Sequence, residues 1–222
     1  MIAAIIRETL RRRWTGVYFY LFVAAIVMLA VVTVMSDLEA EAGLGPAMLA
    51  FFLAFELIGP EASSGSLQLV LARPVRRSSY LLARYAGVVL SATGVILIAA
   101  IAALVTAAIA EIPIDARPFA KALIATVVDT FFPMAMIAFF GAFTSSFANA
   151  LLYLFYLVAV TVSASKVAEL APRFHARVWP ELTPQVVPGV LSGHLVAISN
   201  ALVVLVLAAL ILNRRELGYG KE

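Results

Sequence analysis

The sequence predicts an all-α membrane protein with six transmembrane helices and an N-terminal interfacial helix. Hydrophobic residues make up 64% of the chain and charged residues only 13%, whereas ordinary globular chains are about half apolar and about a quarter charged. The mean hydropathy is +1.03. The apolar residues fall into blocks of roughly the length that a helix needs to cross a bilayer. We therefore interpret residues 1–222 as one transmembrane domain.

Residues 1–14 are expected to form a helix in the cytoplasmic interface of the membrane. Four apolar residues share one helical face while the arginines lie mostly elsewhere, a pattern typical of helices that lie along a bilayer surface. These four are Ile2, Ile5, Ile6 and Leu10. A signal peptide is the alternative, but the apolar run that follows is longer than a signal h-region and has no A-x-A-like cleavage site. We therefore expect a retained anchor.

Six apolar blocks are expected to cross the bilayer. They cover approximately residues 17–35, 46–60, 85–110, 119–143, 149–165 and 190–212. The second block is short, because about 20 residues are needed to span about 30 Å of hydrocarbon, so its helix must continue past Gly59 or end inside protein. Ser78 or Ser79 is expected to cap the helix of the third block. Small residues at multiples of four, from Gly87 to Ala107, favour close packing within the protomer, with a dimer interface as the alternative.

Ionisable residues within the spans are candidates for a substrate path or for gating. Asp129 lies near the middle of the fourth block, and an intramembrane carboxylate is costly enough to suggest a function. Pro133, four residues later, frees the carbonyl of Asp129 from its helical hydrogen bond and is expected to kink the helix. The alternative for Asp129 is a structural hydrogen bond across the bundle, with its carboxyl protonated. Glu56, near the inner end of the second block, either pairs with a loop arginine or reaches the interface.

The sequence offers little support for a metal site. Cysteine is absent and there are only two histidines, which removes thiolate sites and the usual histidine patterns. Asp37, Glu39 and Glu41 are interpreted as a solvated outer loop rather than as a cation site, because no further ligands cluster nearby. Residues 166–189 carry four prolines and are expected to form short re-entrant or interfacial helices on the outer face.

The distribution of basic residues predicts that both termini are cytoplasmic. Lysine and arginine are enriched in the cytoplasmic segments of membrane proteins. With the N-terminus inside, the inner segments hold most of the basic residues. These are Arg7, Arg11, Arg12, Arg13, Arg73, Arg76, Arg77, Arg84, Arg214, Arg215 and Lys221. An even number of spans follows, and we expect a multi-pass protein of the cytoplasmic (inner) membrane whose surroundings are the lipid bilayer.

The polar stretch from Phe55 to Tyr85 interrupts the apolar chain and is expected to contact a soluble partner. It combines glutamates, a Ser-Ser-Gly-Ser turn, an apolar run too short to span a bilayer, and four arginines. The residues follow the order E, G-S-L, a leucine run, P-x-x-R and a basic residue that opens the next helix. They are Glu61, Gly65, Ser66, Leu67, Leu71, Pro74, Arg77, Tyr80 and Arg84.

This order resembles the first cytoplasmic loop of type-2 ABC exporter permeases, although Arg84 stands where that family often has lysine. The resemblance implies that the loop holds a coupling helix that docks an ATPase subunit. The docking residues so implied are Glu61, Gly65, Leu67, Val70, Leu71, Pro74, Arg76 and Arg77. It also implies two copies of an ATP-binding subunit and a second permease chain, in a homodimer or a heterodimer. ATP and Mg would belong to the ATPase, and no cofactor is expected in this chain.

The sequence carries no recognisable catalytic motif. It has no G-x-x-x-x-G-K-[ST] loop, no H-E-x-x-H and no G-x-S-x-G. Ser192 and His194 are only two residues apart and so do not face each other on a helix. The sequence has no basic face with interleaved aromatic residues that would indicate nucleic-acid binding. The function that the resemblance implies is the permease subunit of an ATP-driven exporter, which is not itself an enzyme. The alternatives are a haem-exporter-like membrane subunit and a non-transporting membrane scaffold or assembly factor.

Overall fold

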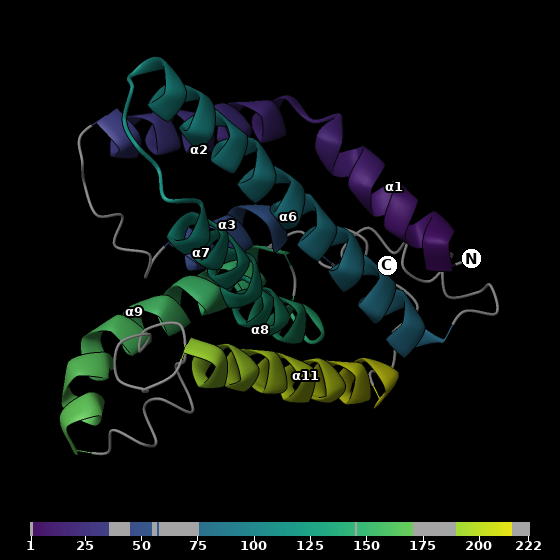
Figure 1. Cartoon of the computed structure of the whole chain (residues 1–222). Helices are drawn as coiled ribbons and strands as arrows, with labels where there is room; N and C mark the ends of the chain where they lie inside the picture. The colour runs from purple at the N-terminus through teal and green to yellow at the C-terminus, as the bar shows by residue number, and fades with distance from the viewer. Residues whose placement is uncertain are drawn as a thin grey trace.

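The described part of the chain is helical throughout. The computed structural model describes residues 2–35, 45–54, 57, 76–144, 146–170 and 190–214, and within these ranges every regular element is an α-helix. The helices are α1 (Ile2–Trp14), α2 (Val17–Met35), α3 (Gly45–Ala54), α6 (Arg77–Ile109), α7 (Ala116–Asp129), α8 (Phe131–Gly141), α9 (Ser146–Leu170) and α11 (Val190–Arg214) (Figure 1). The prediction of an all-α protein is confirmed.

Four stretches of the described residues are long and apolar enough to cross a membrane. They are Val17–Met35, Arg77–Ile109, Ala116–Gly141 and Leu195–Arg214. These correspond to the predicted first, third, fourth and sixth spans. Phe147–Ala159, which overlaps the predicted fifth span, is a shorter apolar helix, and α3 overlaps the predicted second span. The count of six spans therefore remains a prediction.

The third span begins earlier than the sequence indicated. Helix α6 starts at Arg77 rather than at residue 85, so Arg84 lies two turns inside the helix and does not open it. The expected serine cap is also wrong. The N-cap residue is Arg76, which makes no side-chain capping hydrogen bond, and Ser78 and Ser79 lie within the first turn. An arginine is readily placed inside a helix when its charge has partners there.

The far end of α6 closes in a Schellman-type turn. The Ile112 amide donates to the Ala107 carbonyl at 2.9 Å, and Glu111 takes a left-handed backbone conformation with φ of 56°, the position that usually ends a helix in this way. Helix α7 then starts behind Asp115, whose carboxylate accepts from the Arg117 amide at 3.0 Å. An aspartate at this N-cap position satisfies an amide that has no partner within the helix.

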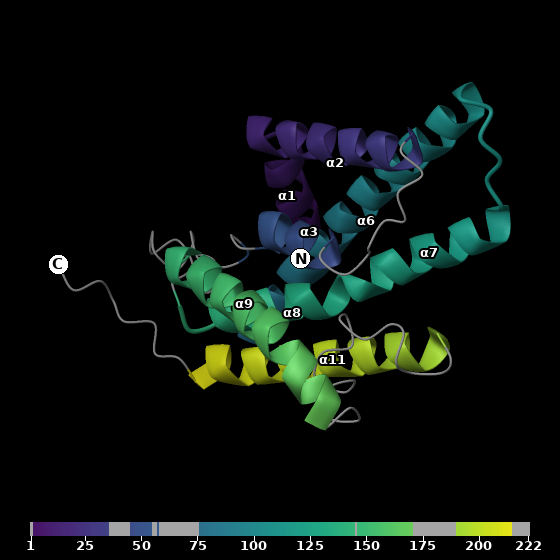
Figure 2. The same cartoon turned by 90° about the vertical axis from the view of Figure 1, so that its left-hand side faces the viewer.

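Helix α8 is the centre of the bundle. It contacts α3, α6, α7 and α9, and its most extensive contact is with α11 (Figure 2). Its side chains are buried from Phe132 to Ala135 and again at Ile137 and Ala138. By contrast, α2 buries only Phe19, and Tyr18 is 88% exposed. Apolar exposure on this scale is expected of a helix whose other neighbours are lipid tails.

Helix α1 packs closely along α6. A Cβ atom added at Gly87 would lie 2.8 Å from the Cβ of Thr9, and one added at Gly94 would lie 3.0 Å from the Trp14 ring. Thr9 lies against Gly87, and Trp14, later in α1, lies against Gly94, later in α6, so the two helices run roughly parallel (Figure 1). The expected use of Gly87 for packing within the protomer is confirmed. The placement of α1 in the membrane interface remains a prediction.

We predict that Gly87→Ala destabilises the protein by about 1–3 kcal/mol, the usual effect of overpacking. The new methyl group would meet Thr9 at its rigid Cβ rather than at a flexible side-chain end. The test is the apparent melting temperature in detergent, measured by size-exclusion chromatography after heating. Gly16→Ala is the matched control, because its Cβ would lie 3.7 Å from the nearest atom, the Arg13 carbonyl oxygen. Equal melting temperatures for the two variants would contradict this packing.

Candidate functional site

The candidate site is a polar joint at the end of the bundle where α1 and α6 begin and α11 ends. Its central side chain is Arg84, which is only 8% exposed. Arg84 Nε donates to the Leu57 carbonyl oxygen at 3.2 Å, and Nη1 donates to Thr9 Oγ1 at 3.2 Å. The guanidinium also lies 5.9 Å from the centroid of the Tyr80 ring, within the range of a cation–π interaction. Arg84 therefore joins α1 and α6 to the backbone that follows α3.

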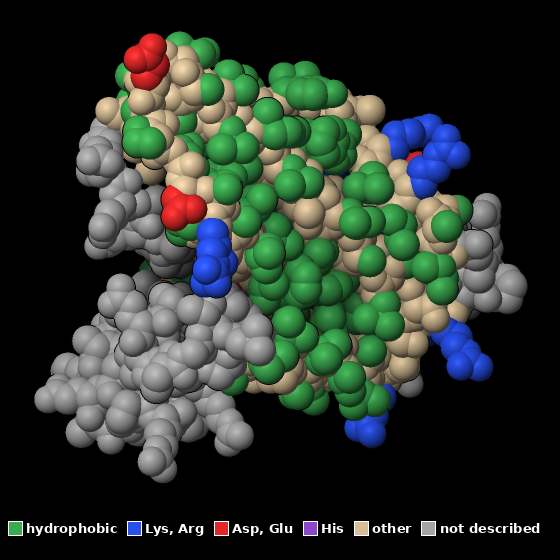
Figure 3. All heavy atoms as spheres, viewed as in Figure 1, with side chains coloured by type: hydrophobic (Ala, Val, Ile, Leu, Met, Phe, Trp, Pro, Cys, Tyr) green, Lys and Arg blue, Asp and Glu red, His purple; other side chains and the backbone are tan. Residues whose placement is uncertain are grey.

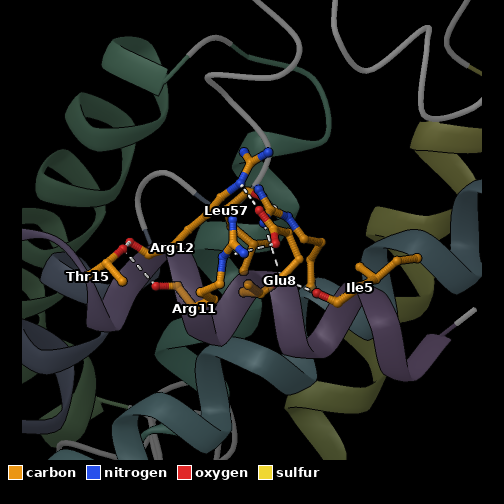
Figure 4. Close-up of polar contacts among 8 residues, drawn as sticks. Ile5, Glu8, Arg11, Arg12, Thr15 and Leu57 are labelled. Atoms are coloured by element: carbon orange, nitrogen blue, oxygen red, sulfur yellow. Dashed lines mark hydrogen bonds and ion pairs between the residues drawn. The ribbon is translucent and has the colours of Figure 1, made fainter.

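Thr9 is suited to its place in this joint. Its hydroxyl donates to the Ile5 carbonyl at 2.8 Å and accepts from Arg84, so both of its hydrogen-bonding functions are used. The side chain is 2% exposed and fits against Gly87, where any side chain on α6 would keep the helices apart. Figure 4 shows the polar contacts around this part of α1, with Leu57 drawn beside them.

The outer side of α1 carries a small group of exposed charges next to the joint. Glu8 accepts from Arg12 Nε at 2.9 Å and lies 3.6 Å from Arg11 Nε (Figure 4). The hydrogen bond from Arg12 lowers the pKa of the Glu8 carboxyl, and the charges of Arg11 and Arg84 lower that pKa further. The ionised Glu8 carboxylate therefore stabilises the folded state at neutral pH, and this stabilisation is lost as the pH falls through the lowered pKa. The stabilisation is small because these side chains are exposed to solvent.

A second arginine connects α6 to the end of α11. Arg77 Nη1 donates to the Leu212 carbonyl oxygen at 3.2 Å and to the Asn213 carbonyl oxygen at 3.5 Å. The last carbonyls of a helix have no partner within it and carry a partial negative charge. A guanidinium with five N–H donors can serve two such carbonyls at once. Arg77 therefore caps α11 from a neighbouring helix.

Together, the two arginines frame the predicted docking loop. Leu57 and Arg76 are the described residues nearest to it on either side. Most of the predicted docking residues lie outside the described residues: Glu61, Gly65, Leu67, Val70, Leu71 and Pro74, and also Glu56. Of the predicted docking set, the structure places Arg76, which is exposed, and Arg77, which lies on the end of α11.

Charge is unevenly distributed between the two ends of the described bundle. Arg7, Arg11 and Arg12 on α1, Arg76 beside α6 and Arg214 on α11 are exposed at the end that holds the joint. Figure 3 shows basic side chains at this end, with acidic and basic side chains together at the other. The opposite end carries Glu111, Asp115, Arg117 and Lys121. This asymmetry agrees with the basic bias expected of a cytoplasmic face.

The helix is irregular near Asp129, where a kink is predicted. Helix α7 ends at Asp129 and α8 begins at Phe131, but Thr130 between them keeps helical backbone angles of φ −76° and ψ −18°, so the break is a one-residue interruption within the span Ala116–Gly141. Pro133 has no amide hydrogen and cannot donate to the Asp129 carbonyl. Asp129 is half-buried and Pro133 is buried. The Tyr85 hydroxyl, from α6, donates to the Phe131 carbonyl at 2.9 Å and so ties the break to the third span.

Sequence reasoning missed three parts of this arrangement. Thr9 gave no signal, because one threonine among arginines on a short amphipathic helix suggests nothing in particular. The carbonyl oxygen of Leu57 has no side-chain signature. Tyr85 was interpreted only as the start of a span, although a tyrosine within an apolar block must place its hydroxyl somewhere. That need is the one signal that pointed to a partner.

The fold and the joint define a class: a helical multi-pass membrane protein with a basic end built around buried arginine contacts. Residues 40–186 match the family model described as ABC-2 family transporter protein. This match covers more than half of the chain, from before α3 to beyond α9, and includes the loop framed by Arg84 and Arg77. The protein belongs to the ABC-2 transporter family and is a membrane component of ABC transport. A comparison with curated proteins found no match.

We predict that Arg84 and Thr9 stabilise the protein cooperatively. A hydrogen bond to a charged group contributes about 1.5–3 kcal/mol, so Arg84→Met should lower stability by about 2 kcal/mol and release the Leu57 carbonyl. Thr9→Val keeps the shape against Gly87 but removes the hydroxyl, and should cost about 1 kcal/mol. The measurement is a double-mutant cycle of unfolding free energies in detergent. Fully additive effects would show that the two side chains do not interact.

Proposed function

We propose that this chain is the permease subunit of an ATP-driven ABC exporter. In this proposal it pairs with a second permease chain, as a homodimer or a heterodimer, and with two copies of a separate ATP-binding subunit. ATP and Mg bind to those subunits, so the chain itself carries no cofactor and catalyses no reaction. Closure of the ATPase dimer would push on the loop between Leu57 and Arg76 and shift the two permease chains relative to each other.

The observation that carries the proposal is the framing of this loop. A segment that receives force from a partner needs firm attachment to the spans at both of its ends. Leu57 is held by Arg84, and the start of α6 is held on α11 by Arg77. The family match supports a transporter role for the same segment.

Within the loop, an apolar helical face is proposed to fill a groove on the ATPase. Leu67, Val70 and Leu71 match such a face, while Glu61, Gly65 and Pro74 follow the family pattern on either side of it. Arg76 is exposed and would lie at the rim, where a charge steers association more than it holds the complex. The cytoplasmic location of this end, and of both termini, is supported by the exposed arginines around the joint.

The break between α7 and α8 is proposed as the gating element of the substrate path. A proline interruption inside a span lets two half-helices change their relative direction. Asp129 ends the first half, and Pro133 lies in the first turn of the second, which begins at Phe131. Glu56 precedes the backbone held by Arg84. A structural role for Asp129 is the competing explanation, and the variants described below distinguish the two.

The alternatives have their own discriminating observations. A haem-exporter-like subunit would also co-purify with an ATPase but would respond to haem. A scaffold or assembly factor would insert into the membrane and hold partners without any effect on ATP hydrolysis. The family match favours transport over a scaffold.

We predict that Leu71→Asp releases the ATPase subunit while the spans stay inserted, because burying a carboxylate in an apolar groove is costly and the loss of a central anchor typically costs about 2 kcal/mol or more. Arg76→Ala, the rim control, should act weakly and in a salt-dependent manner. Co-purification of the ATPase in detergent measures both. Full retention of the ATPase by Leu71→Asp would overturn the docking assignment.

The same chain allows a clean test of orientation. Cysteine is absent from the sequence, so Arg76→Cys, at the exposed rim position, would be the single labelling site. A membrane-impermeant maleimide should label it in inverted vesicles but not in intact cells. Labelling from outside the cell would place the loop on the wrong side for a cytosolic ATPase.

We predict that Asp129→Asn keeps folding and ATPase binding but lowers the ATPase activity of the reconstituted complex, if the carboxylate takes part in gating. Asparagine keeps the shape of the side chain and can still form hydrogen bonds, while the charge is lost. Asp129→Leu should additionally lower the yield of assembled complex if Asp129 has a structural role. Normal activity and assembly in both variants would leave Asp129 without either role.

A further inference from the structure

Two adjacent arginines at the start of α6 have different surroundings. Arg76 is exposed, and its carbonyl accepts from the Tyr80 amide at 3.0 Å. Arg77 is partly buried and directs Nη1 to the carbonyls of Leu212 and Asn213. A sequence pattern treats them as one basic pair. Among the described residues, Arg77 donates side-chain hydrogen bonds to another helix, α11.

Arg77 contacts α11, and α11 packs on α8, the central helix of the bundle. Leu212, whose carbonyl Arg77 caps, is fully buried. Helix α11 makes its most extensive contact with α8, and α8 begins at the break behind Asp129. The hydrogen bonds of Arg77 therefore connect the start of α6 to the end of α11, in addition to the direct contacts that α6 makes with α11 and α8.

We propose that Arg77 is a positioning residue that transmits movement of the docking loop to α11. The inference rests on the proposed function, because it assumes that an ATPase acts on the loop. Arg84 holds the α3 side of the loop to α1, and Arg77 holds its α6 side to α11. Loss of Arg77 removes the hydrogen-bonded link between the start of α6 and the end of α11, while the other predicted docking residues are unchanged. ATP hydrolysis then continues while the spans respond less.

The test is a distance measurement across the contact in the complete complex. Nitroxide labels are placed on Leu90→Cys in α6 and Leu207→Cys in α11, two exposed positions of the cysteine-free chain. The permease, with its ATPase bound, is reconstituted into phospholipid nanodiscs. Electron–electron double resonance gives the distance between the labels without nucleotide and after trapping with ATP and vanadate. ATP hydrolysis and the ATPase content of each sample are measured in parallel.

Three substitutions are compared with the parent protein, which should change its label distance on trapping. Arg77→Ala should lose at least half of the change in distance in those complexes that hold the ATPase, as judged from the measured ATPase content. Arg76→Ala, which removes the same charge one residue earlier, should keep the full change. Arg77→Lys retains a cation and N–H donors for the two carbonyls and should restore most of the change. If Arg77→Ala does not insert, Arg77→Gln takes its place, with the same expected loss.

Three other results would contradict either this proposal or the proposed function. A full distance change in Arg77→Ala would overturn the proposal. Loss of the ATPase from Arg77→Ala but not from Arg76→Ala would overturn it in another way, by making Arg77 a docking contact. Failure of the parent permease to hold an ATPase would instead refute the proposed function, and that failure is visible before any label distance is compared.

Discussion

The arrangement of this protein depends on one buried cation. Arg84 is almost fully enclosed, and its guanidinium reaches a threonine hydroxyl on α1 and a backbone carbonyl behind α3. Removing a charge from water is costly unless its N–H groups are satisfied. The contacts of Arg84 can form only if α1 comes close to α6, and the absence of a side chain at Gly87 allows that approach. Arg84, Gly87 and Thr9 therefore depend on one another, because the contact between Arg84 and Thr9 needs the close approach that Gly87 allows.

This constraint determines how the docking loop is attached. Because Arg84 fixes the backbone at Leu57, the position where the chain leaves the spans follows that of α1 and α6 rather than that of α3 alone. On the other side, Arg77 attaches the start of α6 to α11. Tyr85, one residue after Arg84, reaches across to the break between α7 and α8. The first three turns of α6 thus contact the N-terminal helix, the last span and the interrupted span.

The spans were more predictable than the contacts. Hydropathy predicted α2 with its observed bounds and α11 to within two residues, because lipid selects for long apolar runs whatever their neighbours. It placed the start of α6 eight residues too late, because arginines normally mark the end of an apolar block. Here Arg77 and Arg84 lie within the helix because they find backbone carbonyls. Pro133 predicted a kink near Asp129, because its missing amide hydrogen leaves the Asp129 carbonyl without a helical partner, and the helix is interrupted one residue later, at Thr130.

Basic residues on one face of a membrane protein are usually explained by topology alone. That explanation does not distinguish the roles of the individual residues. Arg11, Arg12 and Arg76 are exposed, and their charge can bias orientation without precise placement. Arg77 and Arg84 carry the same charge, but their N–H groups donate hydrogen bonds to carbonyl and hydroxyl oxygens of other segments. Lysine would satisfy the topological requirement at either position. It would bridge two acceptors less well, because its donors radiate from one nitrogen rather than from a planar fork. The geometry therefore favours arginine where a segment must be held from two sides at once.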